Sequence, residues 1–413
     1  MRHDWFKTRG YRHFDAPVSI SYTQKASDPA FVAKHSWLPL IHYTKRIKRY
    51  KSKDGKTVYK DRPIMFASHR DSCILAKYAF DIGTFLDECY RKIGLSDHVI
   101  AYRRLGRANY NFASDAYRYA EAHQPCVVLC FDITGFFDNL DHAILKNRLK
   151  GLLGVDELSP DWYAVFRSVT KFSKVARGDL EANPAFGKRI ASRSREPIAT
   201  IAEVRAAGIS IETNKVKFGI PQRTPISSAL SNLYMLDIDA SMASLCAQVG
   251  ALYQRYSDDI LVICPPDSET EIVLALKSAI GAHKLEIKDE KTERAVFGAD
   301  AEDIFQYLGF TMSRSGALIR PSSLARQWRK ARRAIKTTQS IGEQAILDGR
   351  SDKVYTKRLR RRFAPVGARN FSKYARRAAK AFGSKKIVRQ VMRLERMVDD
   401  AIRGINRDAS PTI

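Results

Sequence analysis

The pattern of apolar residues predicts a set of short, buried strands. Residues 126–133 ("CVVLCFDI") are apolar up to a single acid, which is typical of a strand that is covered on both faces. Residues 251–258 and 259–265 ("ALYQRYSD" and "DILVICP") predict two more strands, joined tightly at Ser257 and Asp258. If one sheet contains these strands, their acidic ends can lie together.

Helical periodicity occupies much of the remaining sequence. It predicts helices over 72–93, 109–122, 137–153, 226–248 and 269–282, and basic helices from about residue 321 to the end. Residues 46–66 predict a basic β-hairpin, because Asp54-Gly55 suits a tight turn, and 307–313 ("YLGFTMS") predict a strand. Strands alternating with helices, followed by an all-α basic tail, indicate α+β or α/β architecture. Residues 1–45 give no clear pattern, and 160–215 are mixed.

The charge of the chain indicates a polyanionic partner, most simply nucleic acid. The 413 residues carry a formal net charge of +27. Residues 314–413 alone hold 27 Lys and Arg against seven acids, so most of the excess lies in the tail. There Arg residues three or four apart line one face of the predicted helices, as in "RQWRKARRAIK". This pattern favours phosphate binding over a merely solvated face.

Other features exclude several protein classes. The six cysteines are scattered without a CxxC pair, which favours free thiols in a reducing cytoplasm and argues against a zinc site or disulfides. The charged N-terminus lacks the apolar core of a signal peptide. No apolar run is long enough to span a membrane, so we expect no membrane partner. The oligomeric state is not determined by the sequence.

Acids at the ends of apolar strands are the candidate chemistry. Asp132 ends the first strand, and Asp258 with Asp259 lies at the turn between the other two. Acids beside Val, Leu and Ile are costly to bury unless they are paired or bind a metal. Magnesium favours such sites, and two ions can activate a hydroxyl and stabilise a pyrophosphate leaving group. An isolated acid pair that merely caps a turn is the alternative.

A series of motifs then identifies a family. In chain order these are "FDITGFFDNLDH" (131–142), "GIPQRTPISSALSNLYMLDID" (219–239), "YSDD" (256–259), "IKDEKTE" (287–293) and "YLGF" (307–310). Together they resemble the palm motifs of reverse transcriptases, and the likeness is greatest to retron, group II intron and phage-defence enzymes. The segments "WFKTRGYRHFD", "RPIMFASHRD" and "VIAYRRLGRANYNFA" further resemble bacterial defence-associated reverse transcriptases of the unknown-group class, type 2 branch.

The resemblance implies a right-hand polymerase fold of the α+β class. It implies fingers at 46–125, a palm at 126–313 that includes part of the fingers between 155 and 218, and a basic helical thumb at 314–413. Residues 1–45 are an N-terminal extension of unassigned role. No length remains for a ribonuclease H domain.

The resemblance also assigns the metal site and the catalytic residues. It makes Asp132, Asp258 and Asp259 the carboxylates that bind two Mg²⁺ ions, for which Mn²⁺ is a possible substitute. The backbone carbonyl of Ile133 would complete the metal shell. Lys291 matches a motif lysine near the leaving pyrophosphate, although an ordinary surface lysine is the alternative there.

Nucleotide binding is assigned to three residues by the same resemblance. Phe137 matches the steric gate, whose ring excludes a ribose 2′-hydroxyl. Gln222 matches the glutamine beside the incoming nucleotide, and Arg62 matches the fingers arginine that contacts its triphosphate. The family pattern has glycine after this glutamine, but here the next residue is Arg223. Arginine prevents the same close approach of the backbone, so it is expected to contact template or phosphate instead.

Primer and template contacts are expected from the remaining motifs and from the tail. Tyr256 would abut the primer terminus, and "YLGF" would form the primer grip. The residues assigned to primer or template are Tyr256, Arg223, Leu308, Gly309, Arg329, Arg332, Arg333, Arg360 and Arg361.

These assignments predict a cytoplasmic RNA-directed DNA polymerase. It would copy a cognate, structured non-coding RNA with dNTPs, bind the resulting cDNA–RNA heteroduplex, and act in antiphage defence. Two alternatives stay open. The first is template-independent or protein-primed DNA synthesis, for which Arg223 gives a reason. The second is a catalytically inert RNA-binding scaffold, against which the complete acidic set argues.

Overall fold

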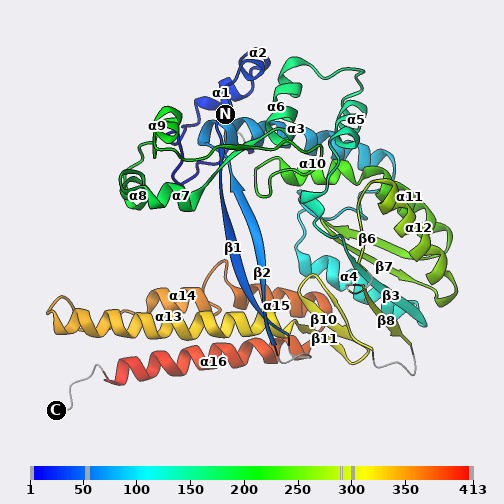
Figure 1. Ribbon diagram of the computed structural model, residues 1–413. Coiled ribbons are helices and arrows are strands. Elements are labelled where there is room, and N and C mark those ends of the chain that lie inside the picture. The colour runs from blue at the N-terminus through cyan, green and yellow to red at the C-terminus, as the bar shows by residue number, and fades with distance from the viewer. Residues whose placement is uncertain (1–3, 52–55, 289, 291, 299–302, 409–413) are drawn as a thin grey trace.

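In a computed structural model, the described part of the chain folds into three sheets surrounded by helices (Figure 1). The structure describes residues 4–51, 56–288, 290, 292–298 and 303–408. Helices pack beside sheets whose strands are mainly antiparallel, so the predicted α+β class is confirmed. Within the described part of the chain, no helix combines the length and apolar character needed to cross a bilayer.

The central sheet holds the strands that the apolar runs predicted. It is antiparallel with strand order β6-β7-β3-β8. Its strands are β3 (Cys126–Asp132), β6 (Leu252–Tyr256), β7 (Asp259–Cys264) and β8 (Glu293–Phe297). Alternate residues of β3 enter two different hydrophobic clusters, Val127 and Leu129 on one face and Cys126 and Val128 on the other. Because both faces are covered, the strand is apolar along almost its whole length.

Helices cover the two faces of this sheet. The Val127 face packs with the helices α3 (His69–Lys92), α5 (His142–Leu153), α10 (Ser227–Tyr234), α11 (Leu236–Gln248) and α12 (Glu269–Ala282). The opposite face is covered by α4 (Asn109–Ala122), by a small antiparallel sheet and by α15 (Phe371–Phe382). The strands of the small sheet are β9 (Phe305–Tyr307), β10 (Phe310–Ser313) and β11 (Gly316–Ile319). Residues distant in sequence therefore share one core.

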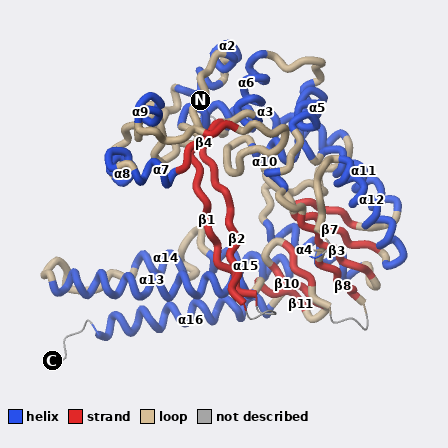
Figure 2. Tube along the Cα trace, viewed as in Figure 1, coloured by secondary structure: helices blue, strands red, loops and turns tan. Residues whose placement is uncertain are grey.

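A long hairpin projects from the upper helices (Figures 1 and 2). It pairs β1 (Leu40–Lys51) with β2 (Lys56–Phe66), and β1 also pairs in parallel with β4 (Ser173–Ala176). The predicted hairpin is thus confirmed, while its predicted turn at Asp54-Gly55 lies outside the described residues. The same region contains β5 (Glu212–Thr213), α6 (Pro160–Thr170), α7 (Arg177–Ala182), α8 (Pro184–Ala191) and α9 (Ile201–Ala206). Short helices α1 (Tyr22–Ala26) and α2 (Pro29–Ala33) belong to the N-terminal part.

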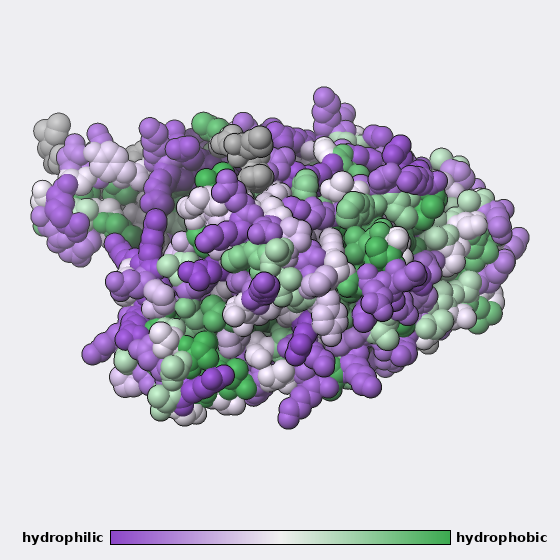
Figure 3. Space-filling model, turned by 90° about the horizontal axis from the view of Figure 1, so that it is seen from above, coloured by the Kyte–Doolittle hydropathy of each residue, from purple (hydrophilic) through white to green (hydrophobic). Residues whose placement is uncertain are grey.

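The C-terminal region is helical, as predicted. Besides α15 it contains α13 (Pro321–Leu347), α14 (Lys357–Phe363) and α16 (Lys385–Asp408). Helices α13, α14 and α16 share a hydrophobic cluster built on residues such as Leu359 and Val398, so their basic residues remain on the outside. Hydrophilic groups also cover most of the face seen from above, with apolar groups in smaller areas (Figure 3).

Three predicted elements differ from the observed ones. The segment 307–313 is two strands, because Leu308 and Gly309 take φ of 47° and 93° and turn the chain between β9 and β10. The predicted helix 226–248 is broken at Met235 into α10 and α11, which pack on α3 and α12 respectively. The helix expected over 137–153 starts only at His142, because the Asp141 side chain accepts hydrogen bonds from two N–H groups of its first turn.

Candidate active site

Three aspartates meet at one end of the central sheet. Asp132, the last residue of β3, lies opposite Asp259, the first residue of β7. The β6–β7 turn carries Asp258, whose backbone carbonyl accepts a 3.2 Å hydrogen bond from the N–H of Ile133. Ser257 has φ of 64°, a left-handed conformation that makes this turn tight. Asp132 and Asp258 are partly buried, and Asp259 is exposed.

The chemistry of this cluster fits a magnesium ion that is shared with a substrate. Magnesium is usually held by one or two carboxylates, with water and substrate phosphates completing its shell. Among the residues that the structure describes, no group of three or more acidic, His or Cys side chains is arranged to hold a metal ion. Lys291, the lysine expected near the leaving group, lies outside the described residues.

Two loops are pinned together beside these aspartates. The N–H of Gly219 donates to the carbonyl of Leu140, and the N–H of Ile220 donates to that of Phe137, both at 2.8 Å. At Gly219, which has φ of 82°, a Cβ would lie 2.8 Å from the backbone oxygen of Asp138. Only glycine permits this approach. The loop after Gly219 therefore runs directly alongside the segment that follows β3.

This arrangement places Gln222 between two elements of the site. Its side-chain Nε2 donates to both carboxylate oxygens of Asp138 at 3.1 Å. Its backbone carbonyl accepts a 3.2 Å bond from the N–H of Met65, which lies on β2. Phe137, the predicted steric gate, is partly buried and packs against the main core. Arg62 lies on β2, three residues before Met65, and is also partly buried.

Arg223 occupies a backbone conformation that favours glycine. Its φ is 78° and its side chain is exposed. The left-handed region costs an L-residue roughly 1–2 kcal/mol. The backbone of Arg223 therefore has the conformation that a glycine adopts easily, although its side chain is large and charged.

Replacing Arg223 with glycine is expected to stabilise the fold relative to replacement with alanine. Alanine keeps the unfavourable φ, whereas glycine removes it at some cost in unfolded-state entropy, so the net difference should be about 1 kcal/mol. Denaturant unfolding of R223G and R223A measures it. A free energy of unfolding for R223A equal to or above that of R223G would contradict the prediction.

A buried ion pair stabilises the β6–β7 turn. Both side chains of Arg255 and Asp239 are fully inaccessible, with Nη2 and Oδ2 at 2.6 Å and Nε and Oδ1 at 2.7 Å. The Arg255 guanidinium also donates to the carbonyl of Ser257 at 3.0 Å and to the side-chain oxygen of Asn232 at 3.2 Å. Tyr253 donates its hydroxyl to Asp239 at 2.8 Å. The conformation of the turn is therefore fixed by a saturated polar network.

The charges of this pair stabilise one another. Burial alone disfavours a charged guanidinium, but the adjacent carboxylate of Asp239 outweighs it and raises the pKa of Arg255. Burial, with the same carboxylate, raises the pKa of the Tyr253 hydroxyl well above its usual value. Neither Arg255 nor Asp239 is predicted as a functional residue by the sequence motifs. The available signal was an arginine in the middle of a strand that is otherwise buried.

The predicted primer and thumb residues lie in three separate places. Tyr256 ends β6, with its ring 6.4 Å from that of Tyr102. Leu308 and Gly309 form the β9–β10 turn, and the Gly309 carbonyl accepts from the N–H of Arg320. Of the five predicted thumb arginines, two line a groove of about 1060 Å³ between α13 and α14, namely Arg329 and Arg333. The others are exposed but do not line it, namely Arg332, Arg360 and Arg361.

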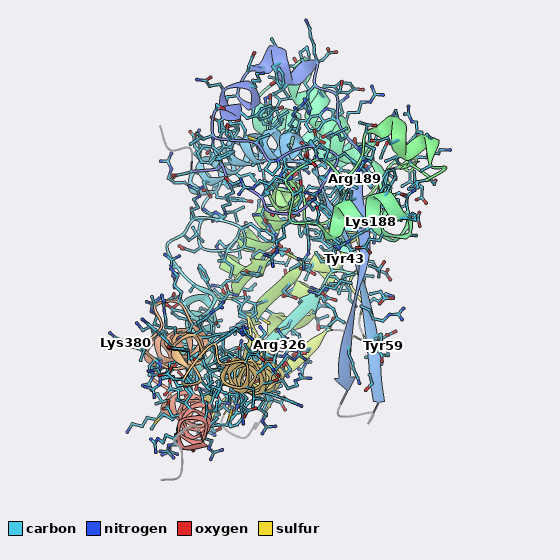
Figure 4. The ribbon with its side chains drawn as sticks, turned by 90° about the vertical axis from the view of Figure 1, so that its left-hand side faces the viewer. Tyr43, Tyr59, Lys188, Arg189, Arg326 and Lys380 are labelled. Atoms are coloured by element: carbon cyan, nitrogen blue, oxygen red, sulfur yellow. The ribbon has the colours of Figure 1, made fainter. Side chains whose placement is uncertain are left out.

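Basic residues occur in both the upper and the lower part of the molecule (Figure 4). The groove between α13 and α14 is also lined by Arg326, Lys330, Arg358 and Arg362. Figure 4 shows Arg326 in the lower part, Lys188 and Arg189 of α8 in the upper part, and Tyr43 and Tyr59 on the hairpin. Groups of this kind bind a phosphate backbone without reading its sequence.

Comparison with known proteins identifies a family. The model of the family described as "Reverse transcriptase (RNA-dependent DNA polymerase)" matches residues 90–312, more than half of the chain. No curated protein matches.

Solved structures with some similarity include three telomerase structures. Apo telomerase of Candida tropicalis truncated from its C-terminal domain has a TM-score of 0.45 at 11% identity, covering 66% of this chain and 53% of that one. Apo telomerase of Candida tropicalis has a TM-score of 0.44 at 11% identity, covering 75% and 54%. Telomerase of Candida albicans, in complex with a fragment of telomeric RNA, has 0.43 at 12% identity, covering 92% and 63%. The chain thus spans between half and two thirds of the length of these structures.

Proposed function

Because the chain belongs to the reverse transcriptase family, we propose that it is an RNA-directed DNA polymerase that extends DNA by nucleotidyl transfer. The observation that carries this proposal is the meeting of Asp132, Asp258 and Asp259 at one sheet end, beside the two pinned loops that bear Phe137 and Gln222.

The aspartates are the metal-binding groups in this proposal. Asp132 and Asp258 would hold Mg²⁺ with Asp259 and the Ile133 carbonyl nearby, and two bound ions would stabilise charge on the reacting phosphates. Mn²⁺ is a possible substitute. The buried Arg255 network holds the turn that presents Asp258, so the carboxylate is positioned before substrate arrives. Lys291 is proposed to neutralise the leaving pyrophosphate.

The pinned loops would position the incoming dNTP. Gln222 is held by Asp138 on its side chain and by Met65 on its backbone, which fixes this residue against both the palm and the hairpin. Phe137 would exclude the 2′-hydroxyl of a ribonucleotide by its bulk. Arg62 on β2 would contact the triphosphate with its guanidinium.

The C-terminal helices would bind the cDNA–RNA heteroduplex through its phosphates. Residues 314–413 carry a net charge of +20, and the groove between α13 and α14 gathers basic side chains. Duplexes with RNA-like geometry are bound through shape and backbone, so this contact needs no sequence specificity.

A finer placement rests on the sequence motifs alone. The segments shared with defence-associated enzymes of the unknown-group class, type 2 branch, support a role in antiphage defence with a cognate, structured non-coding RNA as template. The six cysteines are free, which is compatible with a reducing cytoplasm.

One observation favours a second candidate function. Arg223 takes a left-handed φ and projects its side chain where the family pattern has glycine. A charged residue at this loop alters the surface available to a template strand. Template-independent or protein-primed DNA synthesis is therefore the alternative.

Single-nucleotide addition distinguishes the two. The protein is given a primer on RNA templates that differ only in the first unpaired base, with Mg²⁺ and one dNTP at a time. Templated synthesis adds only the complementary dNTP on each template. The same dNTP added on every template, or dNTP joined to the protein itself, would overturn the leading proposal in favour of the alternative, and no addition to primer or protein would reject both.

A further inference from the structure

Ser257, the residue before Asp258, is held by contacts from two directions. It is only 3% exposed, and its carbonyl accepts a 3.0 Å hydrogen bond from the Arg255 guanidinium. Its hydroxyl lies 3.0 Å from the hydroxyl of Tyr102 in a second hydrogen bond. The first contact belongs to the buried Arg255 network, whereas the second comes from the loop between α3 and α4.

The loop that carries Tyr102 is attached along β6. The N–H of Arg255 donates to the carbonyl of His98 at 2.8 Å, within a short parallel pairing of loop and strand. The side chain of Asn232 donates to the carbonyl of Ala101 at 3.0 Å. Because Asn232 also accepts a hydrogen bond from Arg255, one polar network joins the loop to the strand that ends at the catalytic turn.

Tyr102 has an unfavourable backbone conformation. Its φ is 62°, in the left-handed region that bulky side chains rarely adopt. Ser257 has φ of 64°, so the hydrogen bond joins two residues that both occupy this region. Such strain persists only where the surrounding contacts hold it, and it is concentrated at functional sites. The neighbouring Arg103 is one such contact, since its guanidinium donates to two carbonyls of the same loop.

We propose that Tyr102 is a positioning residue that fixes Ser257, and through it the carboxylate of Asp258, for binding of the metal ion. The proposal rests on the proposed polymerase function. Asp258 directly follows Ser257, so a change in the conformation of Ser257 would move this carboxylate relative to Asp132. Arg255 restrains the backbone of Ser257, and Tyr102 restrains its side chain.

Metal binding tests the proposal without polymerisation. Mn²⁺ is the probe, and the free ion is measured by electron paramagnetic resonance during titration with protein. The signal of interest is the binding that D258N lacks. Y102F removes only the hydroxyl of Tyr102 and should raise the Mn²⁺ dissociation constant about fivefold, the factor expected for one net hydrogen bond. An unchanged constant in Y102F, or native binding no greater than that of D258N, would overturn the proposal.

A double substitution shows whether the two hydroxyls act as one contact. S257A should raise the dissociation constant by the same factor as Y102F. The Y102F/S257A protein should show no larger increase than either single variant, because both substitutions remove the same hydrogen bond. If the two increases multiplied, Tyr102 would not act through Ser257 and the proposal would be wrong.

Y119F is the matched control at the opposite end of the same strand. Tyr119 donates its hydroxyl to the carbonyl of Gly250 at 2.7 Å, just before β6 begins. Y119F therefore loses the same kind of hydrogen bond and should bind Mn²⁺ as the native protein does. Denaturant unfolding establishes that both tyrosine variants are folded. Equal dissociation constants in Y102F and Y119F would contradict the proposed role.

Primer extension then separates the proposal from the polymerase function. In Y102F the Mg²⁺ concentration for half-maximal rate should rise about fivefold, while the KM for dNTP at saturating Mg²⁺ stays at the native value. A raised KM with native Mg²⁺ dependence would instead assign Tyr102 to nucleotide binding and overturn the proposal. If the native protein incorporated no dNTP, the polymerase function would fail, and the Mn²⁺ titrations would still decide the role of Tyr102.

Discussion

Replacing Asp132 with asparagine is expected to reduce dNTP incorporation by about 10³-fold, since the metal's stabilisation of the reacting phosphates is worth several kcal/mol. Asparagine keeps the size of the side chain but removes the charge that attracts a cation. Asp132 is partly buried at a strand end, so the substitution should leave the fold intact. Primer extension in Mg²⁺ at saturating dNTP measures the effect, and the same loss is expected for D258N.

The control for this prediction is D97N, which alters an exposed aspartate outside the site. It should extend primers at the native rate. All three variants should unfold at the denaturant concentration of the native protein, which separates lost chemistry from lost structure. A D132N protein that retained more than about a tenth of native activity would be incompatible with metal-assisted transfer at this site. If a D132N protein that incorporates no dNTP still gave full antiphage defence, this result would support the inert RNA-binding scaffold.

Replacing Arg255 with alanine should destabilise the protein by about 3–5 kcal/mol, because it leaves the carboxylate of Asp239 buried without its partner. The substitution also removes the donor to the carbonyl of Ser257, so the turn that carries Asp258 should lose its fixed conformation. Denaturant unfolding measures the first effect. Primer extension by the R255A protein that remains folded measures the effect on the turn. We expect the extension rate to fall as well.

A surface ion pair provides the comparison. Arg294 makes a similar two-pronged contact with Glu269, but the arginine side chain is 52% exposed. R294A should therefore cost no more than about 1 kcal/mol. If R255A and R294A lowered the free energy of unfolding equally, the buried pair would not be the support that its geometry indicates. The free energy of unfolding of D239N provides a second measurement, since this substitution leaves the Arg255 guanidinium without its counter-charge.

The sequence predicted those parts of the fold that depend on local patterns. The strand 126–132 was recognisable as a continuous apolar run, and the helices 109–122 and 269–282 because their apolar residues recur at the helical period. The right-hand polymerase fold, of the α+β class, was expected from the order of the motifs, and the family match confirms it. The meeting of Asp132 with the β6–β7 turn also followed from placing the strands in one sheet.

Features set by tertiary contacts were not predictable in this way. Gly309 is a local sign of a bulge or bend, but a bulge would leave one strand, and the left-handed turn observed at Leu308 and Gly309 divides β9 from β10. The Arg255–Asp239 pair joins a strand to a helix 16 residues earlier, and each charge alone looks unfavourable in its segment. Residues 4–11 lack periodicity because they lie against other elements rather than forming one.

The shared core on the second face of the central sheet has a practical consequence for dissecting this protein. The family match ends at residue 312, yet Ala375, Ala378 and Ala379 of α15 pack into the same cluster as Cys126 and Val128 of β3. Helix α4 is also fastened to the far end of the chain, because Ser114 donates to the carbonyl of Ala381 at 2.8 Å. A fragment trimmed to the matched segment would expose this apolar face to water and would tend to aggregate. The smallest fragment that can be expressed alone is therefore longer than the boundaries of sequence similarity suggest.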